Sequence, residues 1–266
     1  MIIDGRKLAH LKEVELQKHL AQLSVAPKLV VILVGDDSAS KLYVSLKQQV
    51  AKKVGIKFEL HSFSTSASLQ SIEAIIKAKN ADSKTTGILL QLPIQLDEPN
   101  DLVNQIDPEK DVDCLTNYNL SRLAVGKALF LPAALKAVLT IIKNLKFKIK
   151  NSSICVVGAT GFIGQPLADY LEFLGGKVDR CHSQTLGLAK HTHEAEILIS
   201  ATGVPRLITL DMVKPGALVI DIGSPVGDVD FAQVKTIAGA VTPVPGGVCP
   251  LTVISLLENA ALAVQS

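Results

Sequence analysis

The chain has no hydrophobic run long enough to cross a membrane and carries almost no net charge. Its apolar stretches fall short of the roughly 18 residues that span a bilayer, and residues 1–20 have the pattern of a charged amphipathic helix rather than a signal peptide. A net charge of +2 provides no broad basic surface for nucleic acid. We therefore expect a cytoplasmic protein that acts on a small molecule, with neither a membrane nor a nucleic-acid partner.

Cysteine and histidine are too scattered to indicate a metal centre. The four cysteines, Cys114, Cys155, Cys181 and Cys249, include no C-x-x-C pair, which fits reduced thiols better than zinc or a disulfide framework. Among the six histidines, the run 191–193 lies in a polar stretch that is typical of a loop or a helix end. No metal site is predicted.

The length and composition are those of a well-buried globular protein. The chain has 266 residues, of which 48% are apolar and 20% charged. Because single hydrophobic cores stop growing at about 250–300 residues, we expect two domains around a cleft.

Buried strands and helices alternate along both halves of the sequence. Short apolar runs that end in glycine or proline predict strands buried on both faces, and segments with helical periodicity separate them. In the first half, strands are expected at 28–35, 58–63 and 87–93, and helices from the polar turn 36–40 to Val54 and at 69–78. In the second half, a helix is expected at 131–145, strands at 153–158, 177–180, 196–200, 217–222 and near Ile237, and a last helix at 252–264.

This order predicts an α/β fold of two domains around a cleft, the second a Rossmann-type dinucleotide-binding domain. The last helix has no strand to pair with, so we expect it to return to the first domain. The predicted boundaries are 1–130 together with 250–266 for the first domain, and 131–249 for the second.

A glycine-rich loop between a predicted strand and a predicted helix carries the dinucleotide prediction. Gly158, Gly161 and Gly164 would let backbone N–H groups approach a pyrophosphate at the helix N-terminus. Glycines also mark ordinary turns, but the strand-loop-helix context favours a nucleotide. About twenty residues on, Arg180 and Ser183 stand where an NAD site has an acid, so the strand end either tolerates the extra phosphate of NADP or is simply polar. We favour NADP slightly.

Three polar residues in the first half are candidates for catalysis. Tyr43 and Lys47 are four apart on a predicted helix and so project from one face. A lysine in a partly desolvated cleft beside a phenol can lose its proton and activate water, although this spacing also occurs by chance on surfaces. Gln91 is a lone amide in an apolar strand, and it either orients Lys47 or satisfies backbone groups.

Two further segments have the composition of ligand-binding loops. One carboxylate of Asp111 and Asp113 can grip the edge of a ligand by paired hydrogen bonds, or both are solvated acids in a turn. The segment 242–252 is rigid and rich in glycine and proline, which suggests a loop that passes close to a ligand.

Six motifs in a fixed order give the chain a family resemblance that spans nearly its whole length. They are Tyr43-Val-Ser-Leu-Lys47, Leu90-Gln-Leu-Pro93, Pro108-Glu-Lys-Asp-Val-Asp113, the glycine loop, Cys181-His-Ser183 and Thr242-Pro-Val-Pro-Gly-Gly247. In this order and spacing they resemble the bifunctional methylenetetrahydrofolate dehydrogenase/methenyltetrahydrofolate cyclohydrolase family, which serves one-carbon metabolism and purine biosynthesis.

The resemblance implies two reactions on tetrahydrofolate derivatives in a cleft between the domains. Methylenetetrahydrofolate passes a hydride directly to NADP, or to NAD, and water then attacks the methenyl product to give formyltetrahydrofolate. Lys47 is implied as the central cyclohydrolase residue, supported by Gln91, with Tyr43 packed against the folate and Asp113 holding the pterin. A homodimer is also implied. Further implied contacts are Leu92, Pro93, Pro245, Gly246 and Gly247 for the substrate, and Gly158, Ala159, Thr160, Gly161, Gly164, Ser183 and Ser224 for the dinucleotide.

Several positions depart from the family pattern. Cys114 and Cys249 replace glycines where folate is expected to approach, and Ala159-Thr160 replaces an Arg-Ser pair that helps to hold the NADP phosphate. The segment 132–135 lacks the usual Pro-Cys-Thr-Pro, and the connection 224–229 is shorter than usual. We expect relaxed choice between NAD and NADP and a weakened dehydrogenase.

Three other interpretations remain. The chain could be a cyclohydrolase alone, or a degenerate homologue that binds folate or dinucleotide without turnover. A short-chain dehydrogenase/reductase also combines a glycine loop with a Tyr/Lys pair. In that superfamily the loop comes first, however, whereas here Tyr43 and Lys47 precede it.

Overall fold

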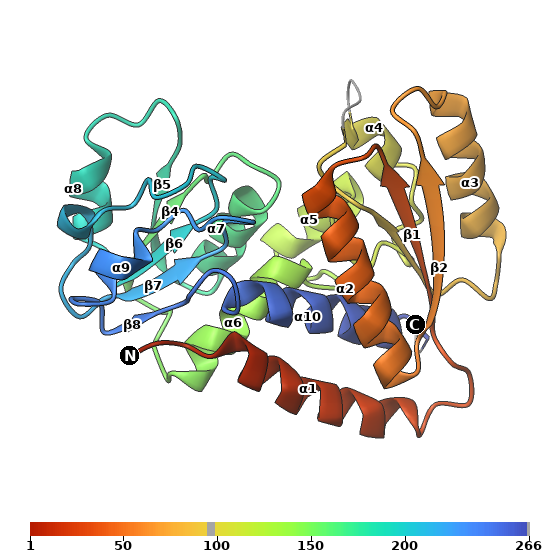
Figure 1. Cartoon of the computed structure of the whole chain (residues 1–266), viewed down its shortest axis with the longest axis horizontal. Coiled ribbons are helices and arrows are strands. Elements are labelled where there is room, and N and C mark those ends of the chain that lie inside the picture. The colour runs from red at the N-terminus through yellow and green to blue at the C-terminus, as the bar shows by residue number, and fades with distance from the viewer. Residues whose placement is uncertain (95–98, 265–266) are drawn as a thin grey trace. The chain divides into compact units, whose positions relative to one another are not determined.

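The computed structural model describes residues 1–94 and 99–264 and divides the chain into two compact units (Figure 1). The three-stranded unit comprises residues 10–122, 127–133 and the chain from Val253 onward. The five-stranded unit comprises residues 1–9, 123–126 and 134–252. Every named strand pairs in parallel, which confirms the predicted fold class of alternating α/β units.

The three-stranded unit has a parallel sheet in the order β2-β1-β3. The strands are β1 (Lys28–Val34), β2 (Lys57–Phe63) and β3 (Gly87–Leu90). β1 and β3 are almost entirely buried because they consist of continuous aliphatic residues, as predicted. The third strand is shorter than expected, since it ends at Leu90 and leaves Gln91 just beyond the edge of the sheet.

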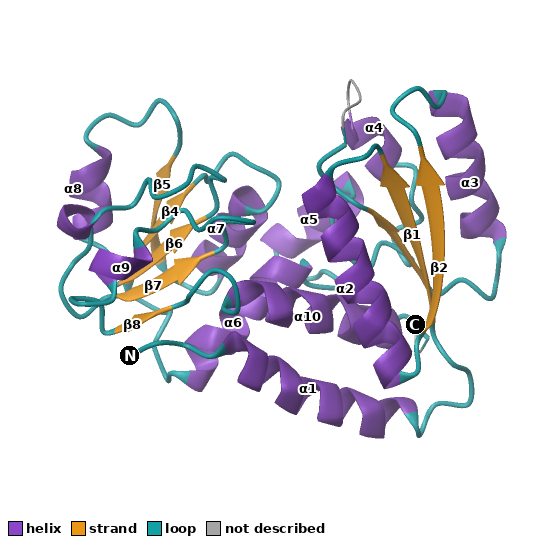
Figure 2. Ribbon diagram, viewed as in Figure 1, coloured by secondary structure: helices purple, strands orange, loops and turns teal. Residues whose placement is uncertain are grey.

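Helices cover both faces of this sheet. The crossover helices α2 (Ser38–Val54) and α3 (Leu69–Ala81) lie on opposite sides of the strands (Figure 2), as right-handed crossovers to the two sides of β1 require. Two short helices that the sequence pattern did not predict are α4 (Pro99–Val103) and α5 (Asn117–Ala124). The first helix, α1 (Gly5–Leu20), begins four residues later than expected.

Helix α2 is fixed at both ends by local hydrogen bonds. The Asp37 side chain accepts a hydrogen bond from the backbone N–H of Ser40 at 2.7 Å, which caps the N-terminus. At the other end Gly55 has φ +93°, a left-handed conformation that glycine adopts without strain, and its N–H bonds to the Ala51 carbonyl. The helix therefore starts and stops at defined residues and presents a fixed face to the sheet.

The five-stranded unit has a parallel sheet in the order β5-β4-β6-β7-β8. The strands are β4 (Ser153–Val157), β5 (Lys177–Cys181), β6 (Ile197–Ser200), β7 (Leu218–Asp221) and β8 (Ala240–Val241). The strand expected near Ile237 thus lies at 240–241. The order reverses between β4 and β6, and ligands of such sheets bind where the carboxyl ends diverge at that point.

Short helices flank this sheet. In Figure 2, α8 (Leu188–His193) and α9 (Phe231–Val234) lie to one side of the strands, and α7 (Gly164–Phe173) lies to the other. The remaining elements are α6 (Ala133–Asn144) and the 3₁₀ turn η1 (Leu210–Met212). Among residues 1–94 and 99–264, no helix is both long and apolar enough to span a membrane.

The last helix, α10 (Val248–Leu262), begins four residues before the predicted start. From Val253 onward it belongs to the three-stranded unit. There the Asn259 amide donates hydrogen bonds to the backbone carbonyls of Val112 and Leu131, both at 2.8 Å. Residues 265–266 of the predicted C-terminal segment lie outside the described residues.

Candidate active site

A buried lysine and a buried amide meet at the carboxyl edge of the three-stranded sheet. Lys47 lies in the middle of α2, and its Nζ donates a hydrogen bond to Gln91 Oε1 at 2.6 Å. Each residue is only 8% exposed. The Gln91 Nε2 group donates to the Leu92 carbonyl at 2.6 Å, so the amide oxygen is the end that faces the lysine. Gln91 therefore performs both roles that the sequence left open, because it orients Lys47 and satisfies a backbone carbonyl.

The carboxylate of Asp113 lies close enough to Lys47 for the two charges to interact. Asp113 is half-buried, and its Oδ1 accepts a weak hydrogen bond of 3.4 Å from the backbone N–H of Ala133. Burial raises the pKa of the Asp113 carboxyl, while the nearby charge of Lys47 acts to lower it and the Asp111 carboxylate acts to raise it. The lysine and the carboxylate are thus close enough to influence each other's charge.

Asp111 and Asp113 have different roles, although only one residue separates them. The buried Asp111 carboxylate accepts hydrogen bonds from the backbone N–H groups of Leu115 (3.1 Å) and Thr116 (2.8 Å) and from the side chain of Asn119 (2.9 Å). These bonds hold the turn that leads into α5. The Asp111 carboxylate is therefore occupied by groups of its own turn, and Asp113 does not share those hydrogen bonds.

Tyr43, Leu92 and Pro93 lie next to this pair in sequence and structure. Tyr43 is half-buried and stands one helical turn before Lys47 on α2. Leu92 is half-buried and Pro93 is exposed, and the peptide bond between them is cis. The Tyr43 phenol and the Lys47 amine thus belong to neighbouring turns of α2, and Lys47 contacts the segment that contains Leu92 and Pro93 through Gln91.

Cys114 does not enter the site that the sequence predicted for it. Its side chain is fully buried, and its backbone has φ +58°, in the left-handed region that glycine adopts most easily. The backbone there keeps the glycine-like conformation, while the thiol packs into the core. Cys249 is half-buried in the first turn of α10.

In the five-stranded unit, the glycine loop connects β4 to α7 at the switch point of the sheet. Gly158 has φ +89°, and a Cβ there would collide with the Ala201 carbonyl at the end of β6. A Cβ at Gly164 would collide with the Gly158 carbonyl. Gly161 and Thr160 are exposed at the tip of the loop, and Ala159 is buried. This tight, Cβ-free turn is the geometry that a pyrophosphate requires.

The glycine loop is hydrogen-bonded to the end of β5. The Cys181 carbonyl accepts hydrogen bonds from Gly158 N–H (2.9 Å) and Ala159 N–H (3.0 Å). Ser183 follows and is exposed. Arg180 does not provide the phosphate contact considered above, because its guanidinium binds Glu172 through two nitrogens, at 2.9 and 2.7 Å, and also forms an ion pair with Asp169 of α7.

Two buried acids, which the sequence analysis did not single out, organise the short connection after β7. Asp221 accepts hydrogen bonds from the backbone N–H groups of Gly223, Asp228 and Val229 at 2.8 to 3.0 Å, and burial raises the pKa of its carboxyl. Asp228 Oδ2 accepts from Ser200 Oγ (2.8 Å) and from a backbone N–H beyond β6. For Asp221, its position at the end of an apolar strand was the available sequence signal, whereas Asp228 lies in the connection that follows.

Ser224 and the segment 245–247 complete the predicted set in the same unit. Ser224 is exposed in the connection after β7. Pro245 is exposed, whereas Gly246 and Gly247 are buried. Gly246 has φ +108°, and its carbonyl accepts a hydrogen bond from Gly5 N–H at 3.0 Å. The structure therefore divides the predicted residues between the two units: Tyr43, Lys47, Gln91, Leu92, Pro93 and Asp113 lie in the three-stranded unit, and all the others lie in the five-stranded unit.

These features define a class: a two-unit α/β protein with a polar buried site in one unit and a dinucleotide-type loop in the other. Comparison with protein-family models gives the family. Residues 3–113 match the catalytic domain of tetrahydrofolate dehydrogenase/cyclohydrolase, and residues 132–266 match its NAD(P)-binding domain. The chain therefore belongs to the tetrahydrofolate dehydrogenase/cyclohydrolase family.

Individual relatives agree with the family assignment over the full length. The bifunctional protein FolD of Nautilia profundicola is 40% identical over 276 residues, which cover 100% of this chain and 97% of the relative. The structure of the bifunctional FolD enzyme of Campylobacter jejuni is 33% identical, with a TM-score of 0.93 and coverage of 100% and 98%. That of the Trypanosoma brucei enzyme, complexed with NADP and an inhibitor, is 30% identical, with a TM-score of 0.95 and coverage of 100% and 97%.

Family membership confirms the resemblance inferred from the six motifs and the pair of activities that give the family its name. It also confirms that the second half of the chain is an NAD(P)-binding domain. The short-chain dehydrogenase/reductase interpretation is thereby excluded.

Proposed function

We propose that this chain oxidises 5,10-methylenetetrahydrofolate with NAD(P)⁺ and hydrolyses the 5,10-methenyl product to 10-formyltetrahydrofolate, with Lys47 as the residue that activates water. Family membership makes the chain an oxidoreductase and a hydrolase of one-carbon metabolism. The observation that carries the residue assignment is the 2.6 Å hydrogen bond between the buried Lys47 Nζ and Gln91 Oε1.

Lys47 is well placed for the hydrolytic step. Its helix is capped at both ends and Gln91 holds its Nζ, so the amine has a fixed position before the substrate arrives. In its neutral form the amine orients the water that attacks the methenyl carbon, and it takes up the proton that this water releases. Tyr43 packs against the folate, and Asp113 accepts hydrogen bonds from the pterin. The family resemblance also implies folate contacts for Leu92 and Pro93, and for Pro245, Gly246 and Gly247.

The dinucleotide is held by the residues of the glycine loop, with Ser183 and Ser224. The loop fits this ligand, because Gly158 and Gly164 admit no Cβ and the tip of the loop is exposed. Bound NAD(P)⁺ supplies the hydride acceptor. Since Arg180 is paired with acids of α7 and Ala159-Thr160 replaces the usual Arg-Ser pair, we propose relaxed choice between NAD and NADP.

We propose that the protein is a cytoplasmic homodimer with two domains. The folate-binding domain comprises residues 1–130 and is completed by residues 250–266, and the dinucleotide-binding domain comprises residues 131–249. The family resemblance supports the homodimer, and the order of the predicted strands and helices supports the domain boundaries.

The Lys47 assignment is tested by Lys47→Met, with Lys52→Met as a matched control on the exposed face of the same helix. Hydrolysis is followed by the loss of methenyltetrahydrofolate absorbance, and reduced cofactor is followed separately. We expect Lys47→Met to slow hydrolysis by about 10² to 10⁴-fold, the usual contribution of a positioned acid or base, and Lys52→Met to leave it unchanged. Full hydrolysis by Lys47→Met would show that another residue activates water.

Hydride transfer is tested by supplying methylenetetrahydrofolate with NAD⁺ and with NADP⁺ in separate assays of the wild-type chain. We expect the chain to reduce both NAD⁺ and NADP⁺, without a strong preference for one of them. If neither is reduced while hydrolysis proceeds, the chain is a cyclohydrolase alone. If both reactions fail but folate or dinucleotide binds, the chain is a silent binder.

A further inference from the structure

Three side chains of metal-ligand type project from one face of the five-stranded sheet, on two neighbouring strands. Cys155 of β4 lies directly opposite Asp179 of β5 in the strand register. Cys181 stands two residues after Asp179, so its side chain points to the same face. Helix α8 lies over this edge (Figure 1) and adds His191. We call these four residues the Cys155 cluster.

Asp179, Cys181 and His191 form a close group of ligand atoms, and Cys155 joins this group through the sulfur of Cys181. The two sulfur atoms of Cys155 and Cys181 are 3.6 Å apart, and both side chains are fully buried. His191 Nδ1 lies 2.6 Å from Asp179 Oδ2. One ligand atom each from Asp179, Cys181 and His191 lie within 4.8 Å of one another.

We propose that the Cys155 cluster is a structural zinc site formed by Cys155, Cys181, His191 and Asp179. Zinc prefers four ligands in a tetrahedron and accepts sulfur, imidazole nitrogen and carboxylate oxygen together. With zinc-sulfur bonds of about 2.3 Å, two thiolates on a tetrahedral ion lie about 3.8 Å apart, close to the 3.6 Å between these sulfurs. As the two bonds to sulfur form, each thiol loses its proton to water.

The other two ligands have room to adjust. On a tetrahedral zinc ion, an imidazole nitrogen and a carboxylate oxygen are about 3.3 Å apart, so the His191 and Asp179 side chains must separate from their present hydrogen bond. Their side chains are 36% and 48% exposed, so solvent reaches part of each of them. The ion enters from this solvent side, while the buried sulfurs form the floor of the site.

The short distance between the Cys155 and Cys181 sulfurs fits a shared metal ion better than a disulfide bond. Cys155 and Cys181 are diagonal neighbours on adjacent strands, because Cys181 pairs with Val157 in the register. A strand spacing of about 4.8 Å and an offset of two residues place their Cα atoms about 8 Å apart. Disulfides need about 4.4 to 6.8 Å. A metal ion can bridge two sulfurs that lie 3.6 Å apart without a bond between them.

The Cys155 cluster is connected to the dinucleotide loop through Cys181. The carbonyl of Cys181 accepts the hydrogen bonds from Gly158 and Ala159 that hold the loop in place. A metal ion that fixes Cys181 to the neighbouring strand therefore also braces the loop. Metal binding at the Cys155 cluster does not depend on the proposed reactions.

The test uses the full-length protein, treated with a chelator and then titrated with Co²⁺, whose absorption spectrum reports tetrahedral geometry and bound sulfur. We expect one equivalent to bind, with an intense sulfur-to-cobalt band that Zn²⁺ abolishes by displacement. His191→Gln should weaken Co²⁺ binding by about 100-fold or more, because it removes a ligand and the loss of a ligand's hydrogen-bond partner alone costs up to about 100-fold. Cys155→Ala should reduce the sulfur band.

Cys249→Ser is the matched control, since it removes a half-buried thiol outside the Cys155 cluster and should leave the spectrum unchanged. If Cys155→Ala does not fold, His191→Gln alone decides, because its side chain is partly exposed and its loss need not disturb the core. The proposal is overturned if the wild-type protein gives no sulfur-to-cobalt band. It is also overturned if that band persists at full strength and affinity in His191→Gln.

Discussion

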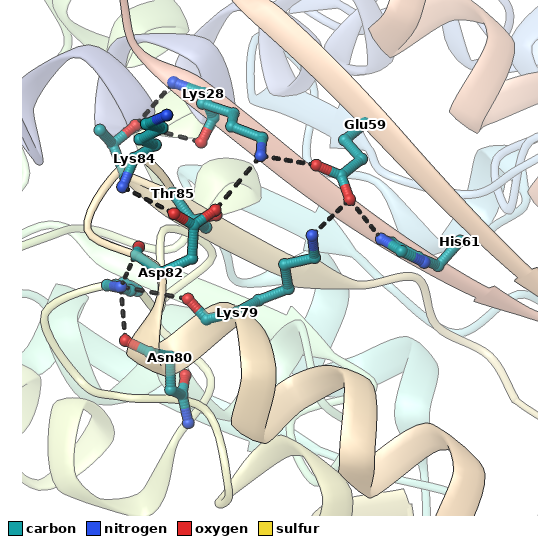
Figure 3. Close-up of polar contacts among 10 residues, drawn as sticks. Lys28, Glu59, His61, Lys79, Asn80, Asp82, Lys84 and Thr85 are labelled. Atoms are coloured by element: carbon teal, nitrogen blue, oxygen red, sulfur yellow. Dashed lines mark hydrogen bonds and ion pairs between the residues drawn. The ribbon is translucent and has the colours of Figure 1, made fainter.

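Glu59 is the centre of a charge network that should make the three-stranded unit sensitive to acid. Its carboxylate lies 2.7 Å from Lys28 Nζ, 2.5 Å from Lys79 Nζ and 2.6 Å from His61 Nε2 (Figure 3). Lys28 also forms an ion pair with Asp82 at 3.3 Å. The hydrogen bond from Lys28, followed by that from Lys79, lowers the pKa of Glu59 from 4.5 to about 2.

The size of the effect follows from this pKa and from exposure. For a fully shielded group, the fall in pKa corresponds to about 3 kcal/mol of stability. Because 29% of the Glu59 side chain is exposed, solvent screening reduces the expected contribution to about 1 to 2 kcal/mol. A carboxylate whose pKa is lowered on folding stabilises the folded state fully above pH 4.5, and this contribution is lost as the pH falls towards 2.

The test compares wild type with Glu59→Gln by urea denaturation from pH 7 to pH 3. We expect the variant to be less stable by about 1 to 2 kcal/mol at pH 7, and the difference to shrink as the pH approaches 3. Glu15→Gln, on an exposed position of α1, serves as the matched control and should show no such trend. A difference that stays constant with pH, or no difference at pH 7, would refute the assigned role of the ion pairs.

Two further predictions concern the five-stranded unit. Gly164→Ala places a Cβ against the Gly158 carbonyl, so it should weaken NADPH binding at least tenfold in a fluorescence titration, and Gly161→Ala should have a smaller effect because its Cβ would lie 3.5 Å from that carbonyl; equal effects would contradict the steric argument. Asp228→Ala removes a buried acceptor and should lower stability by about 1–3 kcal/mol, visible as a lower Tm. Asp228→Asn should keep most of the stability. The amide keeps one oxygen in the place of Oδ2, which accepts the hydrogen bonds, and its nitrogen replaces Oδ1, which has no hydrogen-bond partner among the described residues.

The strands were predictable because their signal is local. Runs of aliphatic residues such as those of β1 and β4 are buried on both faces, and their composition alone identifies them. The helices α4, α8 and α9 have only four to six residues, too few for a helical period to be recognised. The two-residue strand β8 has no pattern of its own and exists because β7 lies beside it.

The candidate site was predictable only in part, because side-chain partners depend on tertiary structure. The Lys47 position could be found from helical spacing and from the isolated amide at Gln91. The separate roles of Asp111 and Asp113 could not, because their sequence context is alike and Asn119 distinguishes them only once the chain is folded. The engagement of Arg180 with α7 likewise has no signal in spacing.

The thiol pair is a similar case. Cys155 and Cys181 are 26 residues apart, and only the strand order makes them neighbours. The sequence-based expectation of no metal site assumed that scattered cysteines stay apart. Two strands that pair in parallel bring them together, so the expectation and the zinc proposal differ for a structural reason.

The capped ends of α2 restrict where this helix can accept an inserted or deleted residue. From the Asp37 cap, each residue turns the helix by about 100°, so one residue gained or lost before Lys47 would swing its amine away from Gln91. Insertions should therefore be tolerated in the connections outside the helix and rejected within residues 38–47. This can be measured with a library of single-residue insertions, scored by methenyltetrahydrofolate hydrolysis. Insertions within residues 38–47 should abolish hydrolysis, and insertions in the connections outside the helix should retain it.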